Sequence, residues 1–279
     1  MPAAEHGKWV TLSQESRPAF AAERRERILE LVRANGTMSL RDIAVKVHAS
    51  EVTIRRDVRA LEAEGLVDRR RGGAALPGRI GHEQSYFGKS GQCAAEKAAI
   101  ATAAARLVRP GDAVTIGPGS TTEALARELV GHGDLTVVTN SLRVAEALTG
   151  AAGVEVVVTG GTLHGPARAL VGRQAERVLE GLRVNRAFLS GNGVSAERGL
   201  STPNPAVAGV DRALAACAEE TIVVADHTKI GADTMVPTVA PEEIAHLVTD
   251  SNADPEVLMT LEETGALVHV VVAADARGQ

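Results

Sequence analysis

The pattern of hydrophobic and polar positions changes character near residue 92. Beyond that point, apolar runs of strand length alternate with segments of helical period. Seven runs are predicted to be strands: Ala113–Ile116, Leu135–Thr139, Val154–Thr159, Ala187–Ser190, Thr221–Ala225, His246–Thr249 and Leu267–Val272. Six of the seven are nearly continuous Val, Ile, Leu or Ala, which is typical of strands covered on both faces. Residues 93–279 are therefore predicted to form an α/β domain with a largely parallel sheet.

Residues 22–75 show a different pattern, that of three short amphipathic helices. The helices are predicted over Glu23–Ala34, over Ser39–Val47, and from Ser50 to about Glu64, where Gly65 ends the last one. Leu66–Gly73 then has the composition of a strand that runs into a basic, glycine-tipped turn. Three helices followed by a basic hairpin describe a winged helix-turn-helix, a fold that places one helix in the major groove of DNA.

The third helix carries the residues suited to that groove. At about 100° per residue, Ile54, Val58 and Leu61 form a buried stripe. The exposed side is mostly basic, and arginine binds guanine edges as well as phosphates. The candidate DNA-binding residues are Ser50 as the N-cap, Val52, Thr53 and Arg56 at base edges, and Arg55, Arg59, Arg69, Arg70 and Arg71 at phosphates. The alternative is an ordinary solvated arginine face. Asp57 borders the buried side and is expected to pair with a neighbouring arginine.

The segments on either side of this domain lack a sustained period. Residues 1–21 are predicted to be a flexible arm. Residues 76–92 are rich in Gly, Pro and Ser and are predicted to be a linker or hinge.

Net charge modifies this picture because it is unevenly distributed. The whole chain carries −5, yet residues 22–75 hold 12 Lys and Arg against 9 Asp and Glu, whereas residues 76–279 are acidic. A basic module joined to an acidic one suggests that only the first binds a polyanion. No apolar run is long enough to cross a bilayer, and the first residues do not form a signal peptide, so a cytoplasmic location is expected. Cys93 and Cys217 lack metal-ligand spacing and are expected to be reduced and buried.

A glycine-rich loop in the second domain has features of a phosphate site. Gly117-Pro118-Gly119-Ser120-Thr121-Thr122 follows a predicted strand and opens a helix, so free N–H groups and hydroxyls would face a ligand. The loop is neither a Walker motif nor Gly-x-Gly-x-x-Gly, and an ordinary strand-to-helix turn is the alternative.

Further polar or small residues follow other predicted strands, where ligands collect in open α/β sheets. These are Asn140, Gly160 with Gly161, and Asp226 with Lys229. For Lys229, a simple surface lysine remains the alternative.

These residues also carry a resemblance to a known family. Arg25–Ala74, with Thr53-Ile54-Arg55-Arg56-Asp57 and Gly72-Gly73-Ala74, resembles the N-terminal domain of DeoR-family bacterial transcription regulators. The resemblance continues through Glu96-Lys97, the Gly119–Thr122 loop, Thr139-Asn140-Ser141, Gly160-Gly161 and Asp226 with Lys229, which look like the family's sensor domain. That domain is similar to ribose-5-phosphate isomerases, and in the family it senses phosphorylated sugars or their breakdown products.

The resemblance implies a regulator, most simply a repressor of a carbohydrate-metabolism operon, that binds double-stranded DNA as a homodimer or homotetramer and needs no cofactor or membrane. It also implies an effector site made of Gly119, Ser120, Thr121, Thr122, Asn140, Gly160, Gly161, Asp226 and Lys229. Two positions depart from the family: Gly117 stands where many relatives have aspartate, and Val207 stands near a position that is often acidic. The loss of two carboxylates predicts a weaker hold on sugar hydroxyls or an unusual effector.

The alternative function is a sugar-phosphate isomerase with an appended DNA-binding domain. In that case Asp226 would be the general base, and Lys229 would steady an enediolate or the phosphate.

Overall fold

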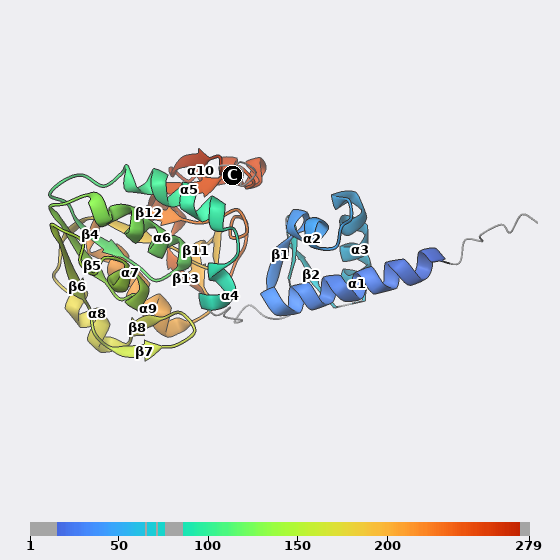
Figure 1. Ribbon diagram of the computed structural model, residues 1–279, viewed down its shortest axis with the longest axis horizontal. Coiled ribbons are helices and arrows are strands. Elements are labelled where there is room, and N and C mark those ends of the chain that lie inside the picture. The colour runs from blue at the N-terminus through green and yellow to red at the C-terminus, as the bar shows by residue number, and fades with distance from the viewer. Residues whose placement is uncertain (1–15, 65, 71, 76–85, 274–279) are drawn as a thin grey trace, which may run out of the picture. The chain divides into compact units, whose positions relative to one another are not determined.

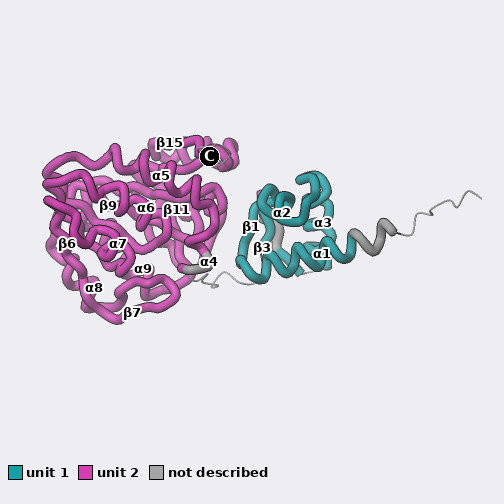
Figure 2. The backbone as a smooth tube through the Cα atoms, in the orientation of Figure 1, with its two compact units in different colours: residues 1–69, 73–77 teal, residues 70–72, 78–279 magenta. Residues whose placement is uncertain are grey.

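The computed structural model describes residues 16–64, 66–70, 72–75 and 86–273. The chain divides into two compact units (Figure 2): unit 1 comprises residues 1–69 and 73–77, and unit 2 comprises residues 70–72 and 78–279. Among the described residues, no helix is long and apolar enough to cross a membrane.

Unit 1 is a winged helix-turn-helix, as predicted (Figure 1). Its elements are α1 (Ser16–Asn35), β1 (Thr37–Ser39), α2 (Leu40–Lys46), α3 (Glu51–Ala63), β2 (Asp68–Arg70) and β3 (Gly73–Ala75). The three strands form one small sheet in the order β1-β3-β2. Apolar side chains from all three helices, including Ile28, Ile43 and Ile54, are fully buried in a common core.

Serine caps define where the second and third helices begin. The Ser39 hydroxyl accepts a hydrogen bond from the Asp42 N–H at 3.0 Å, and the Ser50 hydroxyl accepts one from the Thr53 N–H at 3.2 Å. Each cap pairs a backbone donor that would otherwise be unsatisfied at the helix start. The N-cap role predicted for Ser50 is therefore confirmed.

The boundaries of unit 1 differ from the prediction at two places. Helix α1 begins at Ser16, so the end of the predicted flexible arm is helical, and residues 1–15 lie outside the described residues. Pro18 is tolerated there because it falls in the first turn, where no intrahelical N–H bond is lost. The single strand predicted over Leu66–Gly73 is instead two strands, β2 and β3, and the latter pairs antiparallel with β1.

Unit 2 is built on a seven-stranded parallel sheet in the order β15-β14-β12-β9-β4-β5-β6. All seven predicted strands belong to it, which confirms the predicted fold class. Their bounds are β4 (Ala113–Ile116), β5 (Leu135–Thr139), β6 (Val154–Val158), β9 (Val184–Leu189), β12 (Ala218–Val224), β14 (Ile244–Asp250) and β15 (Leu267–Val271).

Helices cover both faces of this sheet and create two apolar cores. Side chains of α5 (Ala94–Ala105), α6 (Ser120–Glu128) and α7 (Leu142–Ala147) contribute to one core. Side chains of α8 (Arg173–Leu179), α9 (Pro205–Ala216) and α10 (Pro255–Glu262) contribute to the other. The strands alternate between the two cores along their length, since Phe188 belongs to the first and Leu189 to the second.

Several short elements were not predicted from the pattern. They are the antiparallel sheets β7 (Thr162–His164) with β8 (Ala169–Val171), and β10 (Gly193–Ser195) with β11 (Gly199–Thr202) and β13 (Val236–Val239), together with the 3-10 helices Leu129–Gly131 and Pro241–Glu243. These strands have three or four residues each and lack the continuous apolar runs by which the strands of the large sheet were predicted. Of the two cysteines, Cys217 is buried and Cys93 is half-buried, and they do not form a disulfide bond.

The predicted linker, residues 76–92, contains structure of its own. A short helix, α4 (Tyr86–Ser90), lies within it, and Tyr86 is buried. The Tyr86 N–H donates to the Pro166 carbonyl at 2.7 Å, and the Arg143 guanidinium lies 5.4 Å from the centre of the Tyr86 ring. Residues 86–92 therefore pack on unit 2, whereas residues 76–85 lie outside the described residues.

A buried carboxylate joins α3 to α1 in unit 1. Asp57 is 3% exposed and accepts hydrogen bonds from Arg24 Nε at 2.6 Å and Arg25 Nε at 3.4 Å. The predicted pairing of Asp57 with arginine is confirmed, although its partners come from α1 and not from α3. The contact fixes the angle between the first and third helices at the point where their apolar faces meet.

We expect Asp57→Ala to lower the free energy of unfolding of unit 1 by about 1 to 3 kcal/mol, because two charge-assisted hydrogen bonds are lost and two arginines lose their partner. The measurement is urea unfolding followed by circular dichroism. The control is Glu30→Ala, which removes the partner of Arg27 in an exposed pair and should change the free energy by about 0.5 kcal/mol or less. Equal effects of the two substitutions would contradict the role given to Asp57.

Candidate functional site

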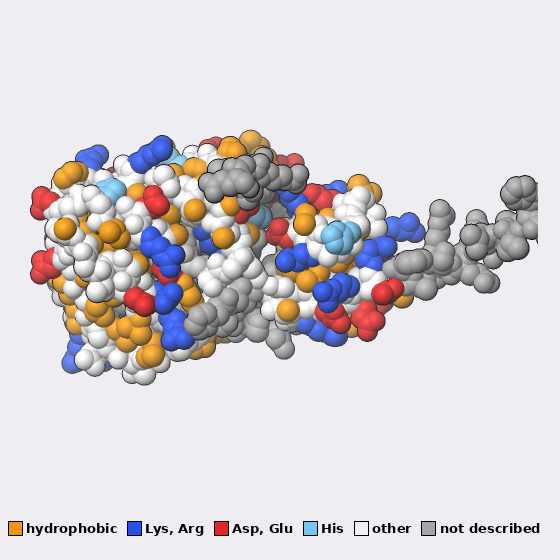
Figure 3. All heavy atoms as spheres, viewed as in Figure 1, with side chains coloured by type: hydrophobic (Ala, Val, Ile, Leu, Met, Phe, Trp, Pro, Cys, Tyr) orange, Lys and Arg blue, Asp and Glu red, His pale blue; other side chains and the backbone are white. Residues whose placement is uncertain are grey.

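Helix α3 presents a basic, exposed face in unit 1. Arg55, Arg56 and Arg59 are exposed, Val52 is 76% exposed, and Thr53 is half-buried. The opposite stripe, formed by Ile54, Val58 and Leu61, is at most 1% exposed. The predicted orientation of the helix is thus confirmed, while contacts of these residues with bases or phosphates stay predictions. Figure 3 shows Lys and Arg side chains around a histidine on the visible face of unit 1.

For the wing arginines, the structure describes backbone positions only. Arg69 and Arg70 lie on β2, next to the turn at Gly72, and Arg71 lies outside the described residues. Their proposed phosphate contacts therefore also stay predictions.

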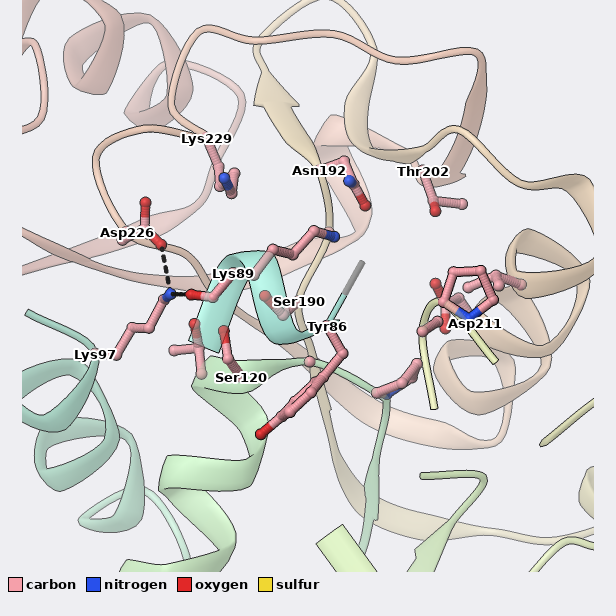
Figure 4. Close-up of a pocket in the computed structure, with 17 residues that line it drawn as sticks. Tyr86, Lys89, Lys97, Ser120, Ser190, Asn192, Thr202, Asp211, Asp226 and Lys229 are labelled. Atoms are coloured by element: carbon pink, nitrogen blue, oxygen red, sulfur yellow. Dashed lines mark hydrogen bonds and ion pairs between the residues drawn. The ribbon is translucent and has the colours of Figure 1, made fainter. Parts of the chain in front are cut away.

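Unit 2 has a pocket at the carboxyl ends of three neighbouring strands. Gly119 and Ser120 follow β4, Ser190 follows β9, and Asp226 follows β12. Five residues of the predicted effector site line it, namely Gly119, Ser120, Thr121, Asp226 and Lys229 (Figure 4). The pocket is also lined by Tyr86, Lys89, Lys97, Ser190, Asn192, Thr202, Val207 and Asp211, which the sequence analysis did not assign to it.

The start of α6 supplies backbone donors to this pocket. Gly119 is the N-cap, with φ of 153°, and a Cβ at this position would lie 3.2 Å from the Ser190 Cβ. The glycine therefore lets the β4 loop pass close to the loop that follows β9. The Thr122 hydroxyl donates to the Gly119 carbonyl at 3.0 Å, so Thr122 stabilises the turn instead of lining the pocket.

Three other residues of the predicted site lie outside the pocket lining. The Asn140 side-chain amide donates to the Leu170 carbonyl at 3.1 Å and so holds the start of β8. Gly160 and Gly161 have positive φ angles of 70° and 114°, and a Cβ on Gly161 would lie 2.8 Å from the Val171 carbonyl oxygen. These residues shape the turn after β6, and the structure does not bring them together with Asp226 and Lys229.

Lysines from three different elements line the pocket: Lys89 from α4, Lys97 from α5 and Lys229 from the loop after β12. Lys97 is 5% exposed, and its ammonium donates to the carbonyls of Lys89 and Gln92 at 2.6 Å each. Burial lowers the pKa of Lys97, and the nearby Asp226 carboxylate opposes that shift. The signal for Lys97 in the sequence was its place beside Glu96 in the family resemblance.

Asp226 is the acidic partner of this cluster. It is 2% exposed, it accepts a hydrogen bond from the Thr228 hydroxyl, and its Oδ2 lies 3.8 Å from Lys97 Nζ. Burial acts to raise the pKa of Asp226, but the positive charges of Lys229 and Lys97 outweigh it, and the pKa is lowered. With Lys97 and Lys229 near one ionised carboxylate, and with the start of a helix in the same lining, this side of the pocket suits an anion.

A second buried acid, Asp211, has the opposite character. It lies on α9, is 1% exposed, and its Oδ1 has no hydrogen-bond partner among the described residues. Burial raises the pKa of Asp211 to about 8, although Arg212 and Lys89 act to lower it. At neutral pH this carboxyl group is therefore mostly protonated.

Comparison with known proteins identifies the chain. A model described as the DeoR-like helix-turn-helix domain matches residues 24–79, and one described as the DeoR C-terminal sensor domain matches residues 92–251. The protein belongs to the DeoR family. It is a DNA-binding transcriptional regulator with a C-terminal sensor domain.

Three relatives of this DeoR-family protein show the extent of the similarity. The uncharacterized HTH-type transcriptional regulator YgbI of Escherichia coli K12 is 36% identical over 82% of this chain and 89% of the relative. The putative aga operon transcriptional repressor of Escherichia coli O157:H7 is 33% identical over 93% and 97%. The regulator GlpR of Haloferax volcanii is 36% identical over 88% and 96%. Among solved structures, ribose 5-phosphate isomerase A of Methanocaldococcus jannaschii matches 48% of this chain and 52% of that chain, with a TM-score of 0.36 and 19% identity.

The two positions at which the sequence predicts a departure from the DeoR family, Gly117 and Val207, both lie at or next to this pocket. Val207 lines it directly. A Cβ on Gly117 would lie 2.8 Å from Leu189 Cδ2 and 3.7 Å from Asp211 Oδ1. The carboxyl group of Asp211 thus lies next to Gly117.

The raised pKa of Asp211 predicts a particular dependence of stability on pH. The folded protein keeps this proton up to about pH 8, whereas the unfolded chain releases it near its ordinary pKa of 3.8. The protonated Asp211 carboxyl group contributes fully to the free energy of unfolding below about pH 4. This contribution is lost as the pH rises toward 8, by about 1 kcal/mol per pH unit. We expect Asp211→Asn to lessen the fall in the urea midpoint of unit 2 between about pH 5 and pH 8.

The matched control for this measurement is Glu180→Gln, because Glu180 is exposed and lies outside the pocket. Its midpoints should follow those of the wild type at every pH. If the Asp211→Asn curve also runs parallel to the wild type, the carboxyl group is already ionised in the folded protein.

Proposed function

We propose that this DeoR-family regulator is a repressor of a carbohydrate-metabolism operon, and that a phosphorylated sugar or related metabolite bound in unit 2 controls its affinity for DNA. The observation that carries the proposal is the pocket in which Lys89, Lys97 and Lys229 lie with the N-terminus of α6. Ammonium groups and free backbone N–H groups are the donors that bind phosphate. The names of relatives such as the putative aga operon transcriptional repressor and the repressor GlcR of Bacillus subtilis agree with the proposal.

For DNA binding, we propose residues 22–75 as the module and α3 as the helix that enters the major groove. Val52, Thr53 and Arg56 would contact base edges near the start of the helix, and Arg55, Arg59 and the wing arginines would contact phosphates. Helix-turn-helix proteins commonly read two half-sites about 34 Å apart, so the proposal includes a homodimer or homotetramer in the cytoplasm.

The link from the pocket to DNA binding is proposed to run through α4. The pocket has a volume of about 50 Å³, far below the roughly 300 Å³ or more of ordinary ligand sites, so a sugar phosphate requires it to widen. Helix α4 contributes Tyr86 and Lys89 to the lining and is held by the Lys97 ammonium. A phosphate that attracts Lys97 competes with those two hydrogen bonds and favours displacement of α4.

Displacement of α4 has a consequence for the chain, because α4 follows directly on the segment that leads from unit 1. An effector shifts an equilibrium only if it binds two arrangements unequally. In one arrangement Lys97 holds α4 in place, and in the other α4 is released. Only the released arrangement leaves Lys97 available to bind a phosphate. Residues 93–279 together with α4 then form the sensor, and residues 76–85 are the connection.

The enzymatic alternative is disfavoured by the state of Asp226, and we propose that the protein is not an enzyme. A general base works best when its pKa lies near the working pH, whereas the pKa of Asp226 is lowered and its carboxylate is occupied by Thr228 and Lys97. Incubation with ribose 5-phosphate and an assay for ketose tests this: turnover at ordinary enzymatic rates would favour the isomerase.

We expect Arg56→Ala to lose discrimination at one or two base positions of the operator, by about 1 to 3 kcal/mol each, because an exposed arginine on α3 is proposed to contact guanine. The measurement is competition binding against a library of operator variants, starting from the DNA upstream of the protein's own gene. Arg33→Ala, an exposed arginine on α1, serves as the control and should leave the preference unchanged. Uniform weakening across all sequences would show that Arg56 binds phosphate instead.

We expect Lys97→Met to shift operator affinity in the absence of effector toward the value that the wild type shows with effector, and to raise the concentration of sugar phosphate needed for any remaining response by about tenfold or more, since the attachment of α4 and one phosphate ligand are removed together. The measurement is fluorescence anisotropy of operator DNA titrated with a panel of sugar phosphates. Arg106→Met, an exposed residue at the end of the same helix, is the control. A variant that responds like the wild type would remove Lys97 from the coupling.

A further inference from the structure

Asp211 is a buried acid that the fold itself does not use. Its carboxyl group is 1% exposed, and the Oδ1 atom makes no hydrogen bond with any described residue. Leaving a buried polar atom unpaired costs about 1 to 3 kcal/mol, so native structures rarely contain one without a reason. Replacement by an apolar residue would remove the cost.

The position of Asp211 points to a ligand. The residue lines the same pocket as Lys97 and Asp226, and Figure 4 shows it on the opposite side of the pocket from those two residues. Thr202 and Asn192 are drawn along the side of the pocket between Lys229 and Asp211, and both line it. The pocket therefore has one side with Lys97, Lys229 and Asp226, and another side with neutral hydrogen-bonding side chains and the Asp211 carboxyl group, on which the charge of Lys89 acts.

Gly117 lies beside the Asp211 carboxyl group. A Cβ on residue 117 would meet Leu189 Cδ2 at 2.8 Å and would lie at an ordinary contact distance of 3.7 Å from Asp211 Oδ1. The acidic group reaches this part of the pocket from α9.

We propose that Asp211 is a specificity-determining residue that binds a hydroxyl group of the effector, so that the pocket selects polyhydroxylated phosphates over phosphates that lack hydroxyl groups. This inference rests on the proposed function, in which the lysines bind the phosphate. A protonated carboxyl group donates one hydrogen bond and accepts another, as a hydroxyl group does, so the two are complementary without a buried charge. The raised pKa of Asp211 agrees with this neutral partner, whereas an ammonium group on the ligand would require the ionised form.

The test uses the full-length protein and three probes that share a phosphate: sorbitol 6-phosphate, glucosamine 6-phosphate and hexyl phosphate. Affinities are measured by isothermal titration calorimetry for the wild type and for Asp211→Leu, Asp211→Asn and the control Glu180→Gln. We expect the wild type and the control to bind sorbitol 6-phosphate at least about tenfold more tightly than hexyl phosphate, because a site built to bond a hydroxyl group rejects ligands without one. Glucosamine 6-phosphate also carries hydroxyl groups, and its ammonium group tests whether Asp211 acts in its ionised form.

The variants separate the hydroxyl contact from the phosphate contact. Asp211→Leu should reduce the preference for sorbitol 6-phosphate over hexyl phosphate to less than about threefold while leaving hexyl phosphate affinity unchanged. Asp211→Asn keeps a neutral donor and acceptor of the same shape and should retain most of the preference. Because asparagine does not titrate, its affinity should stay level above about pH 8, where that of the wild type falls.

Three results would overturn the inference. The first is a preference for sorbitol 6-phosphate that remains in Asp211→Leu. The second is a wild type that binds glucosamine 6-phosphate most tightly, with this affinity lost in Asp211→Asn. The third is a wild type that binds none of the three probes. Anisotropy with operator DNA distinguishes these from failure of the proposed function. If hexyl phosphate weakens or strengthens operator binding, control by phosphates is supported and only the hydroxyl contact is rejected. If the protein binds operator DNA but none of the probes, DNA binding is supported and phosphorylated sugars are rejected as effectors.

Discussion

The sensor unit depends on the compensation of one buried ammonium group, that of Lys97. An isolated buried charge is costly, and burial alone would drive the lysine toward its neutral form. Two backbone carbonyls at the end of α4 and the carboxylate of Asp226 offset that cost. The same three contacts tie together α4, α5 and the loop after β12, so the charge that is most expensive to bury also organises the pocket.

A similar arrangement occurs in unit 1, with the sign reversed. The buried Asp57 carboxylate is compensated by two arginines of α1, and this leaves the arginines of α3 itself exposed. Had Asp57 paired with Arg55 or Arg56, those side chains would have been drawn toward the core and away from the surface. The arginines of α1 therefore stabilise the fold, while those of α3 face outward. The position of Asp57 determines this division.

The sequence predicted the strands and helices of the core well because buried strands of four to seven residues and amphipathic helices leave a clear apolar period. It predicted the Gly119–Thr121 part of the pocket because a glycine between a strand and a helix is typical of a backbone that passes close to a ligand or a neighbouring loop. It was less informative about Asn140, Gly160 and Gly161, since small and polar residues after a strand also form ordinary turns. It missed Lys89 and Asp211, and it noted Lys97 only through the family resemblance, because the meeting of these residues depends on how α4, α5 and α9 pack on the sheet, and no local pattern encodes that.

The strand order also determines which loops can change in evolution without altering ligand binding. From β4 the chain proceeds to β5 and β6 at one edge of the sheet, and from β9 it proceeds through β12 and β14 to β15 at the other edge. Adjacent strands whose connections depart in opposite directions leave a crevice between their following loops, and the pocket opens there. The loop after β6 can therefore lengthen or change in composition at little cost to ligand recognition. The loops after β4, β9 and β12 line the pocket, so evolution of a new ligand preference has to proceed through them or through the helices α4, α5 and α9 that also line it.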